Sequence, residues 1–303
     1  MNAVLLIATV TGILAQNVTT KSYSKRVQGG TYSYAFGRVT FGLLVFVIVA
    51  LCGDGFALER GVVPYSLAFA LAYSVAVIFS TLALATGPLS LTALISQYSL
   101  LVPTVYGVIA LGEKTSVWFY AGVVLLAASL LLVNLKIEKK KKADECGLEN
   151  SIQTAEPKRK INWKWGLFVL LSFIGNGACS TVQKVQQVAF DGEYKSAFMI
   201  VALAVSAVAM IVAAAVSEKK RLGENLKKGA VWYGVCGVAN GLVNLFVLLL
   251  AEKMPSSVMF PIISAGGTVA ATVLSVTVYK EKLTALQIVG VVLGVLAIIA
   301  LNI

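Results

Sequence analysis

The sequence predicts an all-α polytopic membrane protein with ten transmembrane helices arranged as two inverted five-helix repeats. Three observations predict it: an apolar composition, charge-free runs long enough to cross a bilayer, and an internal repeat. The 303-residue chain is 58% hydrophobic and only 13% charged, whereas soluble domains carry about 25% charged residues. This composition excludes an ordinary soluble enzyme, a disordered chain and a disulfide-stabilised scaffold.

Ten apolar runs have the length of a membrane-spanning helix, which needs about 20 residues. They cover residues 2–20, 35–52, 62–83, 89–111, 117–135, 165–183, 196–217, 230–251, 256–279 and 285–302. Of the 25 basic and 14 acidic residues, only Arg38 falls inside a run, and a lone charge at bilayer depth costs at least about 2.5 kcal/mol. The first run has no preceding basic residue, so we do not expect a cleavable signal peptide.

The distribution of basic residues between the loops predicts the orientation. Loops after the first, third, fifth, seventh and ninth runs carry 19 Lys and Arg, and the other loops carry five. Because cytoplasmic loops are enriched in Lys and Arg, the first set is expected to be cytoplasmic. The prediction is a multi-pass protein of the cytoplasmic (plasma) membrane with both termini outside. The membrane surface also accounts for the net charge of +11 without a nucleic-acid partner.

The chain repeats itself at an offset of 168 residues. Arg60–Tyr65 aligns with Lys228–Tyr233, and Glu113-Lys114 aligns with Glu281-Lys282. Earlier in each half the offset is 162 to 163, where Gly30 aligns with Gly192. Each copy holds five runs, an odd number, so the two copies cross the membrane in opposite directions. Inverted repeats of this kind form transporters with a site near mid-membrane at the repeat interface.

The repeat divides the chain into three parts. Residues 1–135 are expected to form the first five-helix repeat and residues 165–303 the second. Residues 136–164 form a basic linker with KKKK at 139–142 and PKRK at 157–160, expected to be cytoplasmic. Anchoring of the topology is the favoured role for these lysines, and binding of lipid is the alternative.

Short motifs in both halves resemble a known family. Leu111–Ser116 (LGEKTS) resembles the EamA signature of the drug/metabolite transporter (DMT) superfamily, and Tyr279–Thr284 (YKEKLT) resembles its second copy. Gly177 followed by Lys184 resembles the pattern of the family's first span. The resemblance covers the chain as a 5+5 arrangement. It implies two EamA-like repeats and a secondary transporter, most often an exporter of metabolites, amino acids or drugs.

The chemistry available inside the spans restricts the function. The sequence has no His, no nucleotide-binding or zinc motif, and no Asp or Glu within a predicted span. We therefore expect no enzyme activity, no cofactor and no metal. Pumps for lipophilic cations usually need a buried carboxylate. The cations nearest a pathway are Lys21, Lys184 and Arg38, which favours an anionic, zwitterionic or neutral polar solute. Snorkelling of the lysines and interfacial anchoring by Arg38 are the alternatives.

Polar residues within the spans are the candidate substrate-binding groups, because buried polar groups need partners or water. The candidates are Gln16, Asn17, Tyr73, Ser74, Gln97, Tyr98, Asn176, Asn240, Asn244 and Ser264. Asn240 and Asn244 lie four residues apart and should share one helix face. Interhelical hydrogen bonding is the competing interpretation.

Prolines and glycines suggest where helices bend and meet. Pro103 and Pro261 lie inside predicted spans, and each is expected to kink its helix and act in gating. Glycines at four-residue spacing, Gly237 with Gly241 and Gly290 with Gly294, should allow close helix contact. The Glu-Lys pairs at 113–114 and 281–282 are expected to cap the helices that follow them.

Together these features predict a secondary transporter, an exporter, that moves a small polar metabolite such as an amino acid by alternating access. Its partners would be the solute and the lipid bilayer, in a monomer or a loose homodimer. The first alternative is an exchanger of phosphorylated metabolites or nucleotide sugars, which would need clustered Lys and Arg in its cavity. The second is a membrane scaffold or sensor that transports nothing.

Overall fold

The computed structural model describes residues 2–27, 30–86, 98–134, 163–219, 221–277 and 285–300. Every regular element within these ranges is a helix, and none is a strand. Each predicted apolar run that lies in the described residues contains helix. The helices are α1 (Asn2–Arg26), α2 (Thr31–Val49) with the π-turn η1 (Ala50–Asp54), α3 (Val62–Thr86), α5 (Leu101–Ile109), α6 (Val117–Asn134), α7 (Trp163–Ala189), α8 (Lys195–Ser217), α9 (Leu222–Lys253), α10 (Ser256–Thr277) and α11 (Ala285–Ala300).

Six helices of the described residues are long and apolar enough to cross a membrane. These segments are Asn2–Thr20, Thr31–Gly53, Val62–Ala83, Trp163–Ala189, Lys195–Ser217 and Leu222–Lys253. Three further apolar segments in α6, α10 and α11 are shorter. The all-helical, strongly apolar structure is that of a multi-pass membrane protein.

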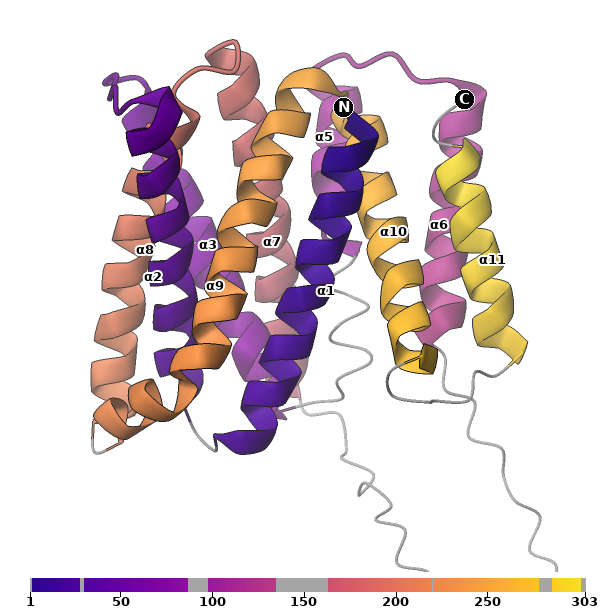
Figure 1. Ribbon diagram of the computed structural model, residues 1–303. Coiled ribbons are helices and arrows are strands. Elements are labelled where there is room, and N and C mark those ends of the chain that lie inside the picture. Colours follow the sequence, from indigo (N-terminus) through magenta and orange to yellow (C-terminus); the bar gives the residue numbers. More distant parts are fainter. Residues whose placement is uncertain are drawn as a thin grey trace, which may run out of the picture.

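The helices stand side by side in one bundle with two distinct ends (Figure 1). The N-terminal end of α1 and the C-terminal end of α11 lie at the same end, called here the upper end. The C-terminal end of α6 and the N-terminal end of α7 lie at the opposite, lower end. The linker between the two halves therefore leaves and re-enters the described structure at the end opposite the two termini.

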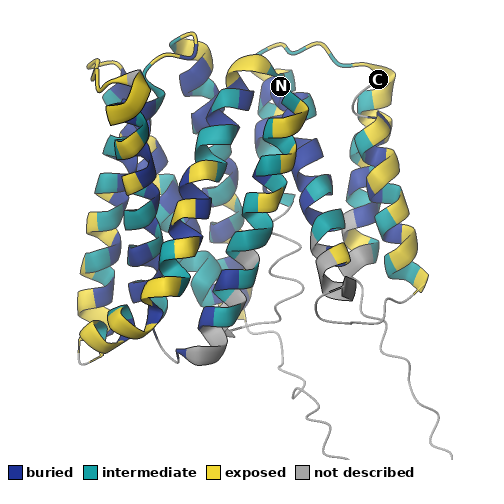
Figure 2. Cartoon of the chain, viewed as in Figure 1, coloured by how far each residue is buried: buried dark blue, intermediate teal, exposed yellow. Residues whose placement is uncertain are grey.

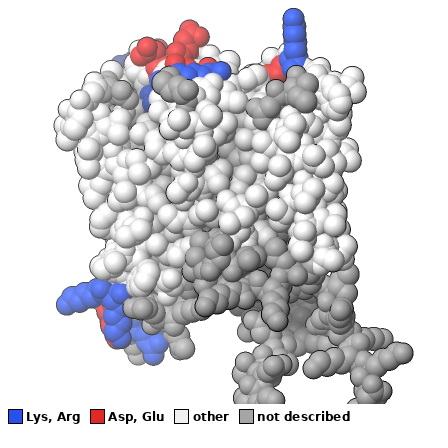
Figure 3. Space-filling model, turned by 45° about the vertical axis from the view of Figure 1, so that its right-hand side comes forward, with Lys and Arg blue, Asp and Glu red and all other residues white. Residues whose placement is uncertain are grey.

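The surface of the bundle suits a lipid environment. Charged side chains gather at the two ends in the view of Figure 3, and the described residues visible between the ends carry no charge. Exposed positions, yellow in Figure 2, occur along the helices between the two ends. Large apolar residues are among the exposed ones, with Leu71 70% and Val124 68% exposed. In water such an apolar surface would be costly, whereas in a bilayer it faces hydrocarbon.

Small residues set the closest helix contacts, as their spacing predicted. A methyl group added to Gly237 of α9 would lie 2.6 Å from the Arg38 carbonyl oxygen of α2. On α11, a methyl group at Gly294 would lie 2.8 Å from Ser129 Oγ of α6, and that hydroxyl donates to the Gly290 carbonyl at 2.6 Å. The expected close contacts at both glycine pairs are confirmed, and both join helices from different halves of the chain.

One local expectation needs correction. Helix α7 continues to Ala189, so Lys184 lies inside the helix and not in the loop after it. Pro103 lies in the first turn of α5, which begins at Leu101 after a turn at 99–100 that separates it from helical residue 98. Pro261 does lie inside α10.

Candidate functional site

A polar network lies inside the bundle along one face of α9. Asn240 is 4% exposed, and its side-chain oxygen accepts a hydrogen bond from the Tyr73 hydroxyl of α3 at 2.8 Å. Its amide nitrogen donates to Gln16 Oε1 of α1 at 3.0 Å. One turn further along α9, Asn244 accepts from Gln183 Nε2 of α7 at 2.9 Å. The predicted shared face of Asn240 and Asn244 thus collects side chains from three other helices.

The network also has internal order. Asn244 Nδ2 donates to the Asn240 carbonyl at 2.8 Å, which links the two halves of the network along α9. Phe69 stacks on Tyr73 with ring centroids 5.5 Å apart and fixes the position of the phenol. Amide side chains both donate and accept hydrogen bonds. The arrangement can therefore exchange partners with a polar solute while keeping its own groups satisfied.

Arg38 borders this network on the α2 side. Its charged group interacts with the Tyr73 and Tyr34 hydroxyls and with the Cys236 thiol. The Thr20 hydroxyl lies 2.8 Å from the Tyr34 hydroxyl and 3.9 Å from Cys236 Sγ. A cation is thus surrounded by neutral polar groups from α1, α2, α3 and α9.

Five of the predicted residues lie together in the structure: Gln16, Arg38, Tyr73, Asn240 and Asn244. Gln183, Thr20, Tyr34 and Cys236 join them and are not among the predicted residues. One signal was available, because Cys236, Asn240 and Asn244 follow each other at four-residue steps along α9.

The other predicted residues lie elsewhere. Asn176 donates to Ser172 Oγ within α7 at 3.3 Å. The Tyr98 hydroxyl donates to the Ala127 carbonyl of α6 at 2.8 Å, and Ser264 is buried in α10. Ser74 follows Tyr73 on α3 and is partly buried. Gln97 and the side chains of Asn17 and Lys21 lie outside the described residues.

A second polar cluster closes the upper end of the bundle. Lys184 is 6% exposed, and its ammonium group donates to the Ala251 and Met254 carbonyls at the end of α9, both at 2.8 Å. Glu113 Oε1 lies 3.8 Å from the same ammonium group. Lys184 therefore caps a helix C-terminus and pairs with a carboxylate. This environment corrects the alternative of simple snorkelling to the headgroups.

Glu113 caps a different helix from the one predicted. Its two oxygens accept from the backbone N–H groups of Ser256 at 2.7 Å and Ser257 at 2.8 Å. These residues begin α10, in the other half of the chain, whereas the sequence favoured a cap on the adjacent α6. A carboxylate at a helix N-terminus accepts hydrogen bonds from N–H groups that have no partner within the helix. Its negative charge also interacts favourably with the positive end of the helix dipole. Glu113 and Lys184 together tie α5, α7, α9 and α10 at one point, named here the upper latch.

The lower end contains a similar carboxylate cap. Glu218, at the end of α8, accepts from the Tyr32 N–H at 2.7 Å and from the Ser33 side chain and backbone at the start of α2. Asn225 of α9 donates to the same carboxylate at 3.1 Å. A buried carboxylate therefore joins elements of both halves at each end of the bundle.

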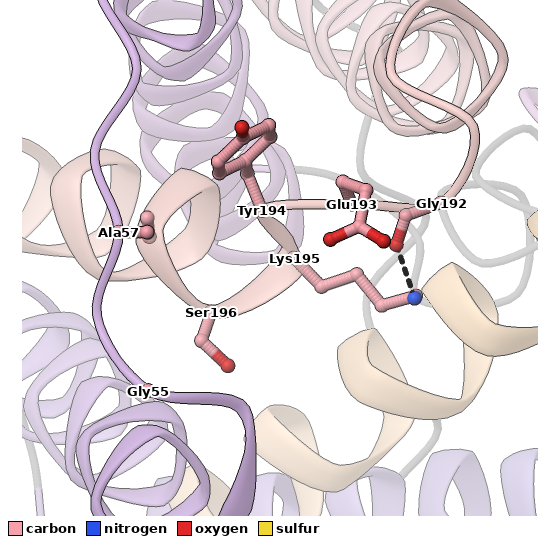
Figure 4. Close-up of a pocket in the computed structure, with 8 residues that line it drawn as sticks. Gly55, Ala57, Gly192, Glu193, Tyr194, Lys195 and Ser196 are labelled. Carbon is pink, nitrogen blue, oxygen red and sulfur yellow. Dashed lines mark hydrogen bonds between the residues drawn. The ribbon is translucent and has the colours of Figure 1, made fainter.

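A pocket of about 340 Å³ opens at the upper end, away from the network. Figure 4 shows it between the segment after η1, with Gly55 and Ala57, and the turn that leads into α8. Lys195 bonds the Gly192 carbonyl across this turn and pairs with Glu252 at 3.1 Å. Its cation is already neutralised, and the pocket is largely lined by turn residues. A hydrogen bond with Glu59 raises the pKa of the neighbouring Tyr194 hydroxyl.

The described residues contain no group of three or more His, Cys, Asp or Glu side chains able to hold a metal ion. The cysteines Cys52, Cys179 and Cys236 are free thiols.

Comparisons with known proteins agree with this architecture. Residues 163–303 match the model of the EamA-like transporter family. A solved structure described as "Crystal structure of protein" superposes with a TM-score of 0.70 at 14% identity, over 99% of this chain and 98% of that chain. At this identity the likeness concerns the fold alone. No curated protein matches the sequence.

Proposed function

We propose that this chain, whose residues 163–303 match the model of the EamA-like transporter family, is a transporter of that family and exports a small polar metabolite such as an amino acid by alternating access. The match supports transport in a membrane as the general function, and family members are transporters rather than enzymes. The solute, the direction and the access mechanism are the parts proposed here.

The buried polar network is the observation that carries the proposal. It lies within a bundle whose described residues between the two ends carry no charge in the view of Figure 3, and it joins α1 and α3 of the first half to α7 and α9 of the second. Polar groups inside a bilayer are costly and mark solute pathways. A site between two halves would open to either face when one half rocks against the other.

The packing of the helices supports the proposed inverted repeat of residues 1–135 and 165–303 about the linker 136–164. α3 packs on α7 and α1 packs on α9, while α2 packs on α8 and α6 packs on α11. The repeat equates α1 with α7, α2 with α8, α3 with α9 and α6 with α11. Replacing each helix by its repeat equivalent turns the α3–α7 contact into the α9–α1 contact and the reverse. The α2–α8 and α6–α11 contacts stay unchanged. A twofold axis in the membrane plane would give this pattern.

The orientation is proposed on the loop charges, with the lower end cytoplasmic and both termini outside. The positions of the termini at the upper end in Figure 1 agree with an even number of crossings. Energy would come from a proton or solute gradient or from exchange.

The decisive experiment is transport by the purified protein in proteoliposomes. We expect uptake of a labelled mixture of L-amino acids above empty liposomes. Tyr73→Phe should lower uptake at least about 10-fold while leaving the fold intact, because it removes the hydroxyl bonded to Asn240 but keeps the stacked ring. Tyr120→Phe, at an exposed position of α6, is the matched control and should transport normally.

Absence of any uptake from a broad panel of solutes would favour the scaffold or sensor. Preferential uptake of sugar phosphates would favour the exchanger of phosphorylated metabolites. Equal activity of Tyr73→Phe and the wild type would place the pathway elsewhere.

A further inference from the structure

Arg38 is a cation placed inside the bundle, and no charged residue of the described ranges pairs with it. It lies seven residues after the first residue of α2, about 10 Å along the helix axis. Its side chain is partly buried, and its Nε is buried with no hydrogen-bond partner in the structure. An interfacial anchor would extend its guanidinium toward the headgroups. Arg38 instead faces Tyr73, Tyr34 and Cys236 in the interior.

The side chains around Arg38 are neutral. Tyr34 is 7% exposed, Tyr73 is 6% exposed and Cys236 is fully buried, and Thr20 bonds Tyr34 at the edge of the group. Among the described residues the ion pairs are Lys184 with Glu113, Lys195 with Glu252 and Lys228 with Glu224. No pair in the described structure neutralises Arg38.

The contrast with Lys184 is informative. The ammonium group of Lys184, which is also buried, is surrounded by one carboxylate and two carbonyl oxygens. Arg38 has hydroxyl and thiol groups and an unused N–H. A charge at this depth is expensive unless it is compensated. An anionic ligand that binds reversibly next to Arg38 would provide this compensating charge.

We propose that Arg38 binds the carboxylate of the transported solute, and this inference rests on the transporter function proposed above. A guanidinium presents a planar set of donors that matches the two oxygens of a carboxylate. The Tyr34 hydroxyl, which shares a hydrogen bond with Thr20, lies at the rim of the site, and the Tyr73 hydroxyl connects the site to Asn240. The amide oxygens of the neighbouring network accept from an ammonium or hydroxyl group on the same solute.

The charge balance selects a carboxylate over a phosphate. A phosphate monoester carries about −1.5 to −2 charges at pH 7. The described part of the site offers one unpaired cation, since Lys184 is held by Glu113. One cation balances one carboxylate. The solute is therefore a small monocarboxylate, either an anion or a zwitterion.

The test measures uptake of four labelled probe mixtures into proteoliposomes: L-amino acids, their amides, 2-oxo acids, and glucose 6-phosphate with glycerol 3-phosphate. Uptake of the amino acids or the 2-oxo acids without the amides is the expected result. Equal uptake of amides and acids would overturn the carboxylate site while leaving the transporter function standing. Preference for the phosphates would also overturn it and favour the exchanger. Uptake of none of the mixtures would remove both proposals.

Variants assign the selectivity to Arg38. Arg38→Gln should weaken the apparent affinity for the carboxylate solutes about 10- to 100-fold and reduce the discrimination between acids and amides to about 2-fold. Arg38→Lys keeps the charge but loses the planar donors, so it should fall between the wild type and Arg38→Gln. Arg60→Gln, at an exposed position of the upper end, is the control and should be unchanged.

A purely structural arginine would change the amount of folded protein without changing the ratio of acid to amide uptake. That ratio, measured on the monodisperse fraction, separates the two roles. If Arg38→Gln does not fold, Arg38→Lys supplies the same ratio. An unaltered ratio in the folded variants would overturn the assignment.

Discussion

The upper latch gives the sharpest prediction on stability, because Glu113 serves two partners in the other half of the chain. Glu113→Gln keeps the size of the side chain but removes its charge. One amide oxygen can still accept from Ser256 or Ser257, while the amide NH₂ faces the second backbone N–H. The change also leaves the ammonium group of Lys184, 3.8 Å away, without its carboxylate.

The size of the effect follows from these contacts. A hydrogen bond to a charged group contributes about 1.5–3 kcal/mol, and breaking a buried ion pair costs about 3–5 kcal/mol. Lys184 keeps its two carbonyl acceptors, so we expect Glu113→Gln to cost about 3 kcal/mol. Lys184→Met should cost a similar amount, about 3 kcal/mol, because it leaves those carbonyls without their donor and Glu113 without its cation. The double variant should fall about 2 kcal/mol short of the sum, because neither partner remains uncompensated.

The assay is denaturant-induced unfolding in detergent micelles, followed by tryptophan fluorescence. Glu224→Gln and Lys228→Met alter an exposed pair on α9 and serve as controls that should leave the midpoint in place. Strict additivity of Glu113→Gln and Lys184→Met, to within about 0.5 kcal/mol, would refute the coupling between the two groups.

Three further predictions concern packing, topology and gating. Gly175→Ala should destabilise the protein by about 1–3 kcal/mol, since the added methyl would lie 2.7 Å from the Ala76 backbone nitrogen, whereas Gly166→Ala on the same helix meets open space and should be neutral or slightly stabilising in the same unfolding assay. A membrane-impermeant maleimide applied to intact cells should label the exposed Cys52 of the upper end but not Cys146 of the linker, and the reverse pattern would invert the orientation. Pro261→Ala should restore a helical hydrogen bond in α10 and slow transport without loss of folded protein, and unchanged rates would remove Pro261 from gating.

The helices were largely predictable because their signal is local. A charge-free run of about 20 residues forms a helix in a bilayer, because a helix satisfies all of its backbone hydrogen bonds within the segment. The four-residue spacing of Gly290 and Gly294 likewise predicted a close helix contact, and α11 makes this contact with Ser129 of α6. The helix ends were less certain, because polar residues such as Lys184 extend α7 beyond its apolar run.

The partners within the site were only partly predictable. Helical spacing placed Asn240 and Asn244 on one face, which is a property of a single segment. The identity of what meets that face depends on how two distant halves pack. Glu113 is an example. The sequence predicted that it caps the adjacent helix α6, whereas in the structure it caps α10, which lies in the other half of the chain. Thr20, Tyr34 and Cys236 are neutral residues whose interest arises only from the position of Arg38.

The candidate site departs from the proposed symmetry of the two repeats, and this departure bears on the proposed function. At the repeat offsets Arg38 aligns with Ile200, Asn240 with Ala72, and Asn244 with Ala76. Ala72 and Ala76 are the residues against which Gly175 makes its close contact between α3 and α7. The same positions thus hold polar groups in the second repeat and a tight apolar contact in the first. Backbone packing needs both proposed repeats to match, whereas the proposed solute with one carboxylate needs only one cation, so the proposed function would account for a break of the repeat at these residues.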